Sequence, residues 1–434
     1  MNIHIAQTLD SQAELALISA SKHKLISAQS SKPNMAIVQD SLLGAYRMTK
    51  SNSKLRKEQF FDICMKIEMS SQEILDRVQQ IRKILKMKGK KTQCFNGRGL
   101  ISMFLPDTLI YERKNDGCPE EPVIKIYRGV LYEGVINKEV VGSSHNSLIQ
   151  VINKEYGCDA AASFIDHIQF VTNNWLMISG FSVGIEDCMV PEGCNEAGVT
   201  KVQQIEDVIQ RCYIEAEGIK TTTAHPGIRE IRVGAVLSKA KDIGLRIAKD
   251  GLREDNNFLS TVYSGSKGDF FNIAQVTGLL GQQSLKGQRV PQTLNHGKRT
   301  LPHYPFGELP VEMEYESRGF IARSFIQGLT PRQVYFHAMS GREGVCDTAN
   351  GTAKSGYMQR KITKLTEDMC TVYDGTVRDK VGTIYQMAYG DDGLNPTKTV
   401  KVGAAQEACD ISRLVARMNL EHEMSRDKVR GKAK

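Results

Sequence analysis

A long proline-free run limits what this chain can fold into. It extends from Pro331 to Asp368 and opens on a strong helix-start signal, because Thr330 can cap a helix, Pro331 suits its first turn and Gln333 can complete a capping box. We expect a single helix of about 38 residues, roughly 57 Å long at 1.5 Å per residue. Such a helix is long enough to cross a nucleic-acid cleft.

The same run contains four glycines, at positions 341, 344, 351 and 356. Each interior glycine costs about 0.8–1 kcal/mol relative to alanine, so four cost roughly 3–4 kcal/mol. Mostly small side chains also recur on one helix face, at Cys346, Ala349, Ala353 and Tyr357. Two interpretations are open: a buried helix that packs through its small residues, and a deformable helix that lies against a base pair.

Composition adds only broad limits. The 434 residues are 41% hydrophobic, which is enough for several domains, and the net charge of +8 suits an acidic partner such as nucleic acid without requiring one. The ten cysteines show no CxxC spacing, so we expect reduced thiols and no zinc site. With no signal-peptide pattern and no apolar run of about 18 residues, we expect an intracellular protein without a membrane segment.

Periodicity predicts a mixture of helices and strands. Residues 54–90 read as helical, with apolar positions on one face at Ile74, Val78, Ile81 and Leu85, and residues 99–145 read as strand-rich.

Helical patterns return after 146 and over 198–250, with a break at "TTTAHPG". Residues 255–330 read as loop-rich, and the C-terminal "SRDKVRGKAK" reads as a frayed basic tail.

Several long motifs occur in a fixed order along the chain. They are "SSKPNMAIVQDSLLGAYRMT", "VVGSSHNSLIQV", "NNWLMISGFSVGIED", "GSKGDFFNIAQVTGLLGQQSLKGQRV", "RTLPHY", "ESRGFIARSFIQGLTP" and the run from "GLTPRQVYFHAMSGREG" to "AYGDDG". They resemble, in this order, the largest subunit of multi-subunit DNA-directed RNA polymerases of eukaryotic, archaeal and large-DNA-virus type. The resemblance covers nearly the whole chain and is weakest at 50–95, at 190–255 and after 396.

The resemblance implies an α+β fold, with a small β-rich pore unit, a helical funnel and one long bridge helix. The implied domains are the end of the active-site domain, the pore domain, the funnel domain, the bridge helix, and the start of the cleft domain with a basic tail. Their boundaries would be 1–50, 51–187, 188–329, 330–368 and 369–434.

The resemblance also implies roles at the active centre. Thr352 and Ala353 would pack under the template base, and Tyr357 would touch the template strand. The structural alternative for these three residues is ordinary core packing. Lys267 in "GSKG" would line the path of incoming nucleotides, although this motif is also an ordinary turn.

Other implied roles concern phosphates and helix support. Arg360, Lys361 and Lys364 would contact phosphates, against the alternative of a solvated helix face. A funnel loop that contacts the bridge helix would contain Gln282, Gln283 and Ser284. His337 reads as a partnered core histidine rather than a catalytic acid.

The sequence departs from the family at the metal site. The family's metal-binding loop reads "NADFDGDEMN", and this chain begins with "MNIHI" and contains no D-x-D pair. We therefore expect Mg²⁺ to be bound by the complex through ligands outside this chain. The family's trigger loop would also lie outside, so we expect the isolated chain to be inactive.

The implied partners are the DNA template, the RNA product, nucleoside triphosphates, the second-largest subunit and the remaining parts of the largest subunit. Nucleus, cytoplasm and virion are all open as locations. One alternative is a non-catalytic nucleic-acid-binding or assembly protein derived from a polymerase, which the missing aspartates favour and the retained motifs oppose. A second is a palm-domain polymerase with a metal-binding YGDD turn at residues 389–392.

Overall fold

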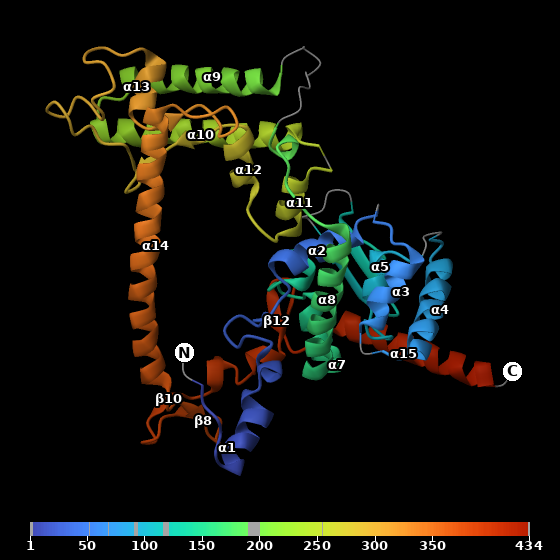
Figure 1. Ribbon diagram of the computed structural model, residues 1–434. Coiled ribbons are helices and arrows are strands. Elements are labelled where there is room, and N and C mark those ends of the chain that lie inside the picture. The colour runs from blue at the N-terminus through green and yellow to red at the C-terminus, as the bar shows by residue number, and fades with distance from the viewer. Residues whose placement is uncertain are drawn as a thin grey trace. The chain divides into compact units, whose positions relative to one another are not determined.

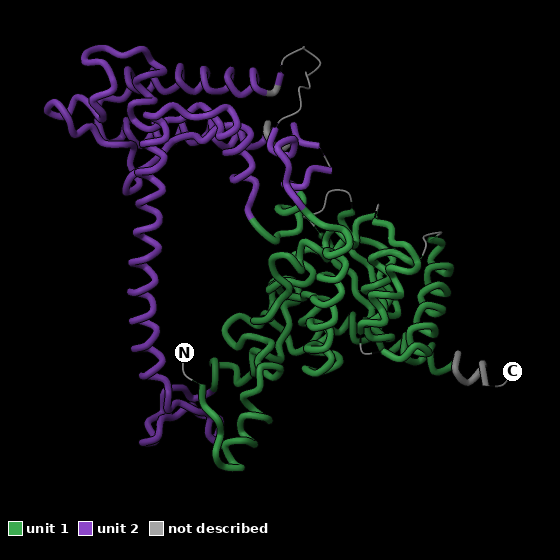
Figure 2. The backbone as a smooth tube through the Cα atoms, viewed as in Figure 1, with its two compact units in different colours: residues 1–181, 260–267, 389–434 green, residues 182–259, 268–388 purple. Residues whose placement is uncertain are grey.

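The computed structural model describes residues 3–51, 53–67, 69–90, 94–115, 121–189, 200–253 and 255–432. The chain divides into two compact units, each assembled from discontinuous segments (Figure 2). Unit 1 contains residues 1–181, 260–267 and 389–434, and unit 2 contains residues 182–259 and 268–388.

Unit 1 is built mainly of helices (Figure 1) and also contains two small antiparallel sheets. Its α-helices are α1 (Leu9–Glu14), α2 (Gln39–Thr49), α3 (Lys57–Met65), α4 (Ser71–Met87), α5 (Gly97–Ser102), α6 (Lys138–Val141), α7 (Leu148–Tyr156), α8 (Cys158–Ser179) and α15 (Ile411–Lys432). Strands β1 (Tyr111–Lys114), β2 (Val123–Tyr127) and β3 (Val130–Glu133) form an antiparallel sheet in that order, and β11 (Val400–Val402) pairs with β12 (Ala405–Glu407).

The core of unit 1 follows from helical periodicity. Helix α8 packs against α2 and α7 and buries Phe164, Ile168, Val171 and Trp175. Helix α4 begins with a capping box and buries the predicted apolar face, which confirms the expectation for Ile74, Val78, Ile81 and Leu85. These side chains join one hydrophobic cluster, so the helices are positioned by a shared core.

The structure differs in part from two expectations for unit 1. The strand-rich interpretation of 99–145 holds only around β1–β3, because residues 97–102 form helix α5, where Asn96 Oδ1 accepts a hydrogen bond from Gly99 N at 2.8 Å. The C-terminal stretch expected to fray continues α15 as far as Lys432. This helix is tied to the unit by an ion pair of 2.9 Å between Arg413 and Glu155.

Unit 2 is built on a pair of long helices. Helices α9 (Lys201–Thr222) and α10 (Pro226–Gly251) lie side by side, joined at the predicted break (Figure 1). The other helices assigned to this unit are α12 (Phe270–Thr277), α13 (Val311–Ser317) and α14 (Pro331–Thr366). The residues of α11 (Asn257–Ser264) are divided between the two units. Its strands are β4 (Gly281–Gln282), β5 (Ser284–Leu285), β6 (Gln288–Arg289), β7 (Phe320–Ile321), β8 (Cys370–Thr371), β9 (Val377–Arg378) and β10 (Ile384–Gln386). The region predicted to be loop-rich thus contains short helices and strands as well as loops.

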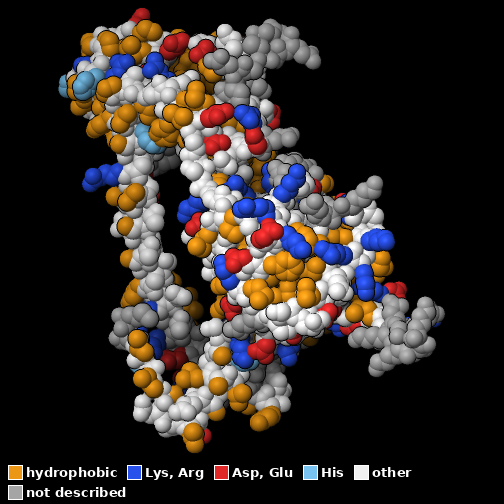
Figure 3. Space-filling view, turned by 45° about the vertical axis from the view of Figure 1, so that its right-hand side comes forward, with side chains coloured by type: hydrophobic (Ala, Val, Ile, Leu, Met, Phe, Trp, Pro, Cys, Tyr) orange, Lys and Arg blue, Asp and Glu red, His pale blue; other side chains and the backbone are white. Residues whose placement is uncertain are grey.

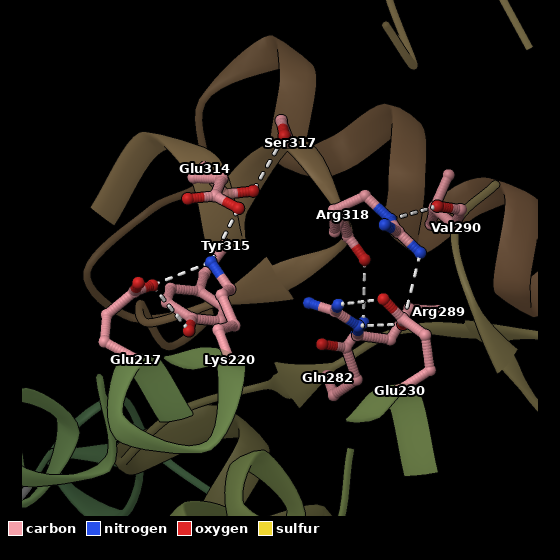
Figure 4. A network of polar contacts seen from close by, with 10 residues as sticks. All are labelled: Glu217, Lys220, Glu230, Gln282, Arg289, Val290, Glu314, Tyr315, Ser317 and Arg318. Atoms are coloured by element: carbon pink, nitrogen blue, oxygen red, sulfur yellow. Dashed lines mark hydrogen bonds and ion pairs between the residues drawn. The ribbon is translucent and has the colours of Figure 1, made fainter. Parts of the chain in front are cut away.

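A polar network fixes the segments that follow α10 onto the helix pair (Figure 4). Two nitrogens of Arg289 donate to the carboxylate of Glu230 at 2.8 and 2.9 Å, and Arg318 donates to the same carboxylate at 3.3 Å. On α9, Lys220 pairs with Glu314 at 2.6 Å, and Glu217 accepts from the Tyr315 hydroxyl at 2.8 Å. Both helices of the pair therefore hold the α13–β7 segment.

We expect Gly134→Ala to destabilise unit 1 more than Gly89→Ala does. Both glycines have positive φ, +93° and +67°, so each alanine brings backbone strain of about 1–2 kcal/mol. A Cβ at Gly134 would also lie 2.4 Å from Ile124 Cα, whereas one at Gly89 meets nothing within 4 Å, so the first variant should lose a further ~1–3 kcal/mol. Urea unfolding can be followed by the fluorescence of Trp175, the single tryptophan of the chain. Equal losses would contradict the prediction.

Candidate nucleic-acid interface

Helix α14 is one unbroken helix of 36 residues, which confirms the predicted long helix. The predicted capping box is present: Thr330 Oγ1 accepts from Gln333 N at 3.4 Å, and Gln333 Oε1 accepts from Thr330 N at 3.0 Å. The helix ends at Thr366, two residues before the expected end at Asp368. Its direction is thus fixed at the N-terminus by local chemistry that the sequence already shows.

Burial anchors α14 only near its start. Within the helix, only Gln333 and Phe336 are buried. The Phe336 ring stacks on Tyr304 with centroids 6.2 Å apart and planes 12° apart, and both belong to a small apolar cluster with Val290. Arg332 adds an ion pair of 3.3 Å to Glu316. The first two turns are therefore seated in unit 2.

A loop of unit 2 supports the next turns. Nδ1 of His337 lies 3.2 Å from Oε1 of Gln283, and the Ser340 hydroxyl donates to the carbonyl oxygen of Ser284 at 3.1 Å. Lys286 N donates to the Glu343 carboxylate at 2.6 Å. His337 is half-buried and partnered.

Gln282 does not join the contacts to the helix. Its Nε2 donates to the backbone oxygens of Gln283, at 2.7 Å, and of Arg318, at 2.9 Å, and the close-up of Figure 4 shows it beside Arg318. Of the three residues predicted to form the supporting loop, the structure thus places Gln283 and Ser284 against α14 and places Gln282 within the polar network.

The rest of α14 is exposed. Every residue from 344 to 366 is exposed in the described chain, and a Cβ added at any of the four helix glycines would meet nothing within 4 Å. On the face drawn in Figure 3, the middle of this helix shows mostly small and uncharged side chains. Within this chain, the interpretation of a buried helix packed through its small residues is therefore wrong, because Cys346, Ala349, Ala353 and Tyr357 all face solvent.

Side-chain hydroxyls weaken the same stretch further. Thr348 Oγ1 donates to the Gly344 carbonyl and Thr352 Oγ1 donates to the Thr348 carbonyl, each at 2.8 Å, and Ser355 Oγ donates to the Thr352 carbonyl at 3.1 Å. Such bonds back to the preceding turn slightly destabilise helices and often bend them. Residues 344–356 thus combine several features that make bending easy.

The end of α14 presents a basic, aromatic face. Ala353, Tyr357, Arg360 and Lys364 recur at spacings of 4, 3 and 4, so they share one side of the helix. The Lys361 ammonium lies 4.3 Å from the centroid of the Tyr357 ring, which is 63% exposed.

The three basic side chains differ in their partners. Among the described residues, no ion pair involves Arg360 or Lys361. Lys364 pairs with Glu367 at 2.8 Å, and the hydrogen bond and charge of that carboxylate raise the pKa of the ammonium. Arg360 and Lys361 are consequently the freer cations.

Lys267 lies in unit 1, whereas α14 lies in unit 2. It is exposed on a turn between Gly265 and Gly268, whose φ values are +73° and +69°. These positive angles explain why glycine flanks the lysine on both sides.

The YGDD sequence does not form a hairpin tip. Tyr389–Asp391 is a short 3₁₀ turn, and the neighbouring strands pair elsewhere, β10 with β9 and β11 with β12. In the described part of the chain, no group of three or more His, Cys, Asp or Glu side chains is placed to hold a metal ion. Both observations oppose the palm-polymerase alternative.

No described helix is long and apolar enough to cross a membrane.

Two contacts of α14 could not be predicted from the sequence. Tyr304 lies in the quoted motif "RTLPHY", but nothing in that motif indicates that its ring would seat Phe336. The contact of Glu343 could not be predicted from the sequence either, because its partner is a backbone N–H in a loop far away along the chain.

Comparisons with known proteins agree across most of the chain. Sequence models of RNA polymerase Rpb1 match in order: domain 3 over residues 24–188, domain 4 over 222–321 and domain 5 over 328–410. The probable DNA-directed RNA polymerase II subunit RPB1 homolog of Invertebrate iridescent virus 6 is 45% identical over 98% of this chain and 42% of its own length. Subunits RPB1-A and RPB1-B of Trypanosoma brucei brucei are each 34% identical over 91% of this chain and 22% of their own length. The chain thus spans less than half the length of these curated relatives.

We expect Gly351→Ala to stabilise α14, because the added methyl group meets no neighbour among the described residues. A peptide of residues 331–366 should gain about 0.8–1 kcal/mol of helix stability. Ala349→Gly, at another exposed helix position, is the matched control and should lose a similar amount. Circular dichroism at 222 nm measures both. A loss of helicity in Gly351→Ala would show that the propensity argument fails here.

Proposed function

The chain belongs to the Rpb1 family of RNA polymerase largest subunits, and from this premise we propose that it forms part of a DNA-directed RNA polymerase in which α14 is the bridge helix that supports the template base. The observation that carries the proposal is the contrast within α14: a buried anchor at Phe336, an exposed glycine-rich middle, and a basic end. Because the chain spans only part of its relatives, RNA synthesis is proposed for the complete assembly.

Template-directed synthesis makes two opposite demands on such a helix. A template base must be held firmly while the primer hydroxyl attacks the incoming nucleotide, and the nucleic acid must then move by one base. The seated N-terminal turns supply the fixed end, and the glycines of the exposed middle lower the cost of a local bend. Thr352 and Ala353 lie in this middle stretch, and their small side chains would let a base approach closely.

The basic end would contact the sugar-phosphate backbone. Arg360 and Lys361 have no described ion-pair partner, so contact with phosphates would not break an existing ion pair. Lys364 would first have to leave Glu367. The Tyr357 ring offers an exposed surface beside Lys361 for stacking on the template strand.

We assign the remaining proposed roles by segment. Residues 51–187 would form the pore and 188–329 the funnel, in which Gln283 and Ser284 support α14. The exposed Lys267 would attract triphosphates on their way to the active centre.

Magnesium ions neutralise charge in phosphoryl transfer, but the described residues of this chain contain no carboxylate cluster that fits one. The ligands would come from the remaining parts of the largest subunit.

The lack of a carboxylate cluster among the described residues favours a competing proposal, in which the chain is a non-catalytic nucleic-acid-binding or assembly protein. Co-purification separates the two. The polymerase proposal requires stable association with the second-largest subunit and with a chain that contains the aspartate-rich loop, whereas an independent binder would elute without them.

We expect Arg360→Ala and Lys361→Ala each to weaken template binding by the assembled polymerase equally for all sequences. Removing one phosphate interaction should reduce the slope of log affinity against log salt by about 0.7–0.9. Lys364→Ala is the matched control and should change the slope less, because Glu367 already holds that ammonium. Titrations with a labelled template at several salt concentrations measure the slope. An unchanged slope in both variants would remove the phosphate contacts from the proposal.

Gly351→Ala in the assembled polymerase should slow nucleotide addition while template affinity stays the same. If the extra helix stability of ~1 kcal/mol must be overcome in each cycle, the rate falls about fivefold. Rapid-quench extension of an RNA primer on a template measures this rate. The proposed function itself fails if the complete assembly with the unaltered chain does not extend RNA.

A further inference from the structure

Unit 1 contains a cavity that the proposed function does not use. Its volume is about 450 Å³, within the usual range of small-molecule sites. The lining comes from three segments that are far apart in the sequence: residues 28–32, His145, and residues 390–406, which include the β11–β12 hairpin.

Hydrogen bonds lock the walls of this cavity together. The carbonyl oxygen of Ser31 accepts from the buried Gln150 amide at 2.8 Å, and the Ser31 hydroxyl lies 3.2 Å from that of Thr399. The Gln406 amide donates to the Thr399 hydroxyl at 2.6 Å. Asn146 donates to the Lys401 carbonyl oxygen at 2.7 Å. The cavity is therefore formed before any ligand arrives.

The charge around the cavity is mainly positive. Lys32, His145 and Lys401 line it, and no ion pair of the described residues involves either lysine. Among the described residues, Asp392 is the one carboxylate in the lining, and one of its oxygens already accepts a hydrogen bond from Leu394 N at 2.9 Å. Burial, and then the charges of Lys32, Lys401 and Arg113, lower the pKa of His145.

The His145 ring also has an unfilled hydrogen-bonding position. Its Nδ1 is buried and has no partner among the described residues. Buried polar atoms in folded proteins nearly always have a partner, so an orphan next to a cavity is expected where a ligand completes the site.

We propose that this cavity binds a phosphate group, held between the ammonium groups of Lys32 and Lys401 beside His145. Lysine binds phosphate as a point charge and needs no fixed fork geometry. Because the cavity is much larger than a phosphate ion, it has room for a nucleoside attached to that phosphate. The residues of this site belong to unit 1, and α14 belongs to unit 2.

Acetylation of lysines in the complete polymerase assembly tests the proposal at the site itself. The assembly is treated with an acetylating reagent in EDTA, with chloride, inorganic phosphate, AMP or a 5′-phosphorylated trinucleotide at matched ionic strength, and each lysine is quantified by mass spectrometry. At least one phosphate compound should slow acetylation of both Lys32 and Lys401 threefold or more. Lys83, exposed on α4, is the internal control and should not change.

The three compounds distinguish the source of the phosphate. Protection by inorganic phosphate assigns a free ion, protection by AMP alone assigns a mononucleotide, and protection by the trinucleotide alone assigns a nucleic-acid end. Lys401→Gln should abolish the protection of Lys32, whereas the matched Lys83→Gln variant should preserve it.

Three results would overturn the proposal. They are no protection at Lys32 and Lys401, equal protection at Lys83, and lysines that do not react even in chloride, which would mean that another part of the assembly covers the cavity. The readout does not depend on RNA synthesis, so an assembly that fails to extend RNA can still show or lack the protection.

Discussion

The stacking of Phe336 on Tyr304 is the main apolar contact that holds α14 in place within unit 2. A helix of 36 residues that buries only two side chains gains little from tertiary packing, so its direction must come from its first turns. The ring pair, the capping box and the ion pair of Arg332 with Glu316 all act within those turns. The helix is consequently fixed at one end and open along the rest of its length in this chain.

The fixed end depends in turn on charges that are partly removed from water. Arg289 has only 8% of its side chain exposed, and its partner Glu230 lies on α10. Burial alone would raise the pKa of Glu230, but hydrogen bonding to Arg289 and the charges of Arg289 and Arg318 outweigh it and hold the pKa below its ordinary value. Removing one partner of such a group leaves an uncompensated charge, so the network fixes the geometry of the segment leading to α14 more than it adds stability.

The sequence could predict those helices that are determined by residues close together in the chain. The start of α14 follows from Thr330, Pro331 and Gln333, and the buried face of α4 follows from spacing. The short helix α5 was missed because its apolar run fits a strand equally well and only the Asn96 cap decides. The orientation of Gln282, the contact of Glu343 and the cavity between Lys32 and Lys401 depend on segments brought together from far along the chain, which no local pattern shows.

The positions of the four glycines in α14 distinguish two possible reasons for their presence, close packing against a partner and easier bending of the helix. A helix that must lie close to one partner needs small residues on a single narrow face. At roughly 100° per residue, the glycines at 341, 344, 351 and 356 spread over about 140° of the helix circumference, and a Cβ at any of them would meet no described neighbour within 4 Å. One close contact would not need so wide a spread, whereas a helix that bends gains from every interior glycine whatever its direction. The placement therefore favours deformability, with the seated first turns as the fixed end of α14.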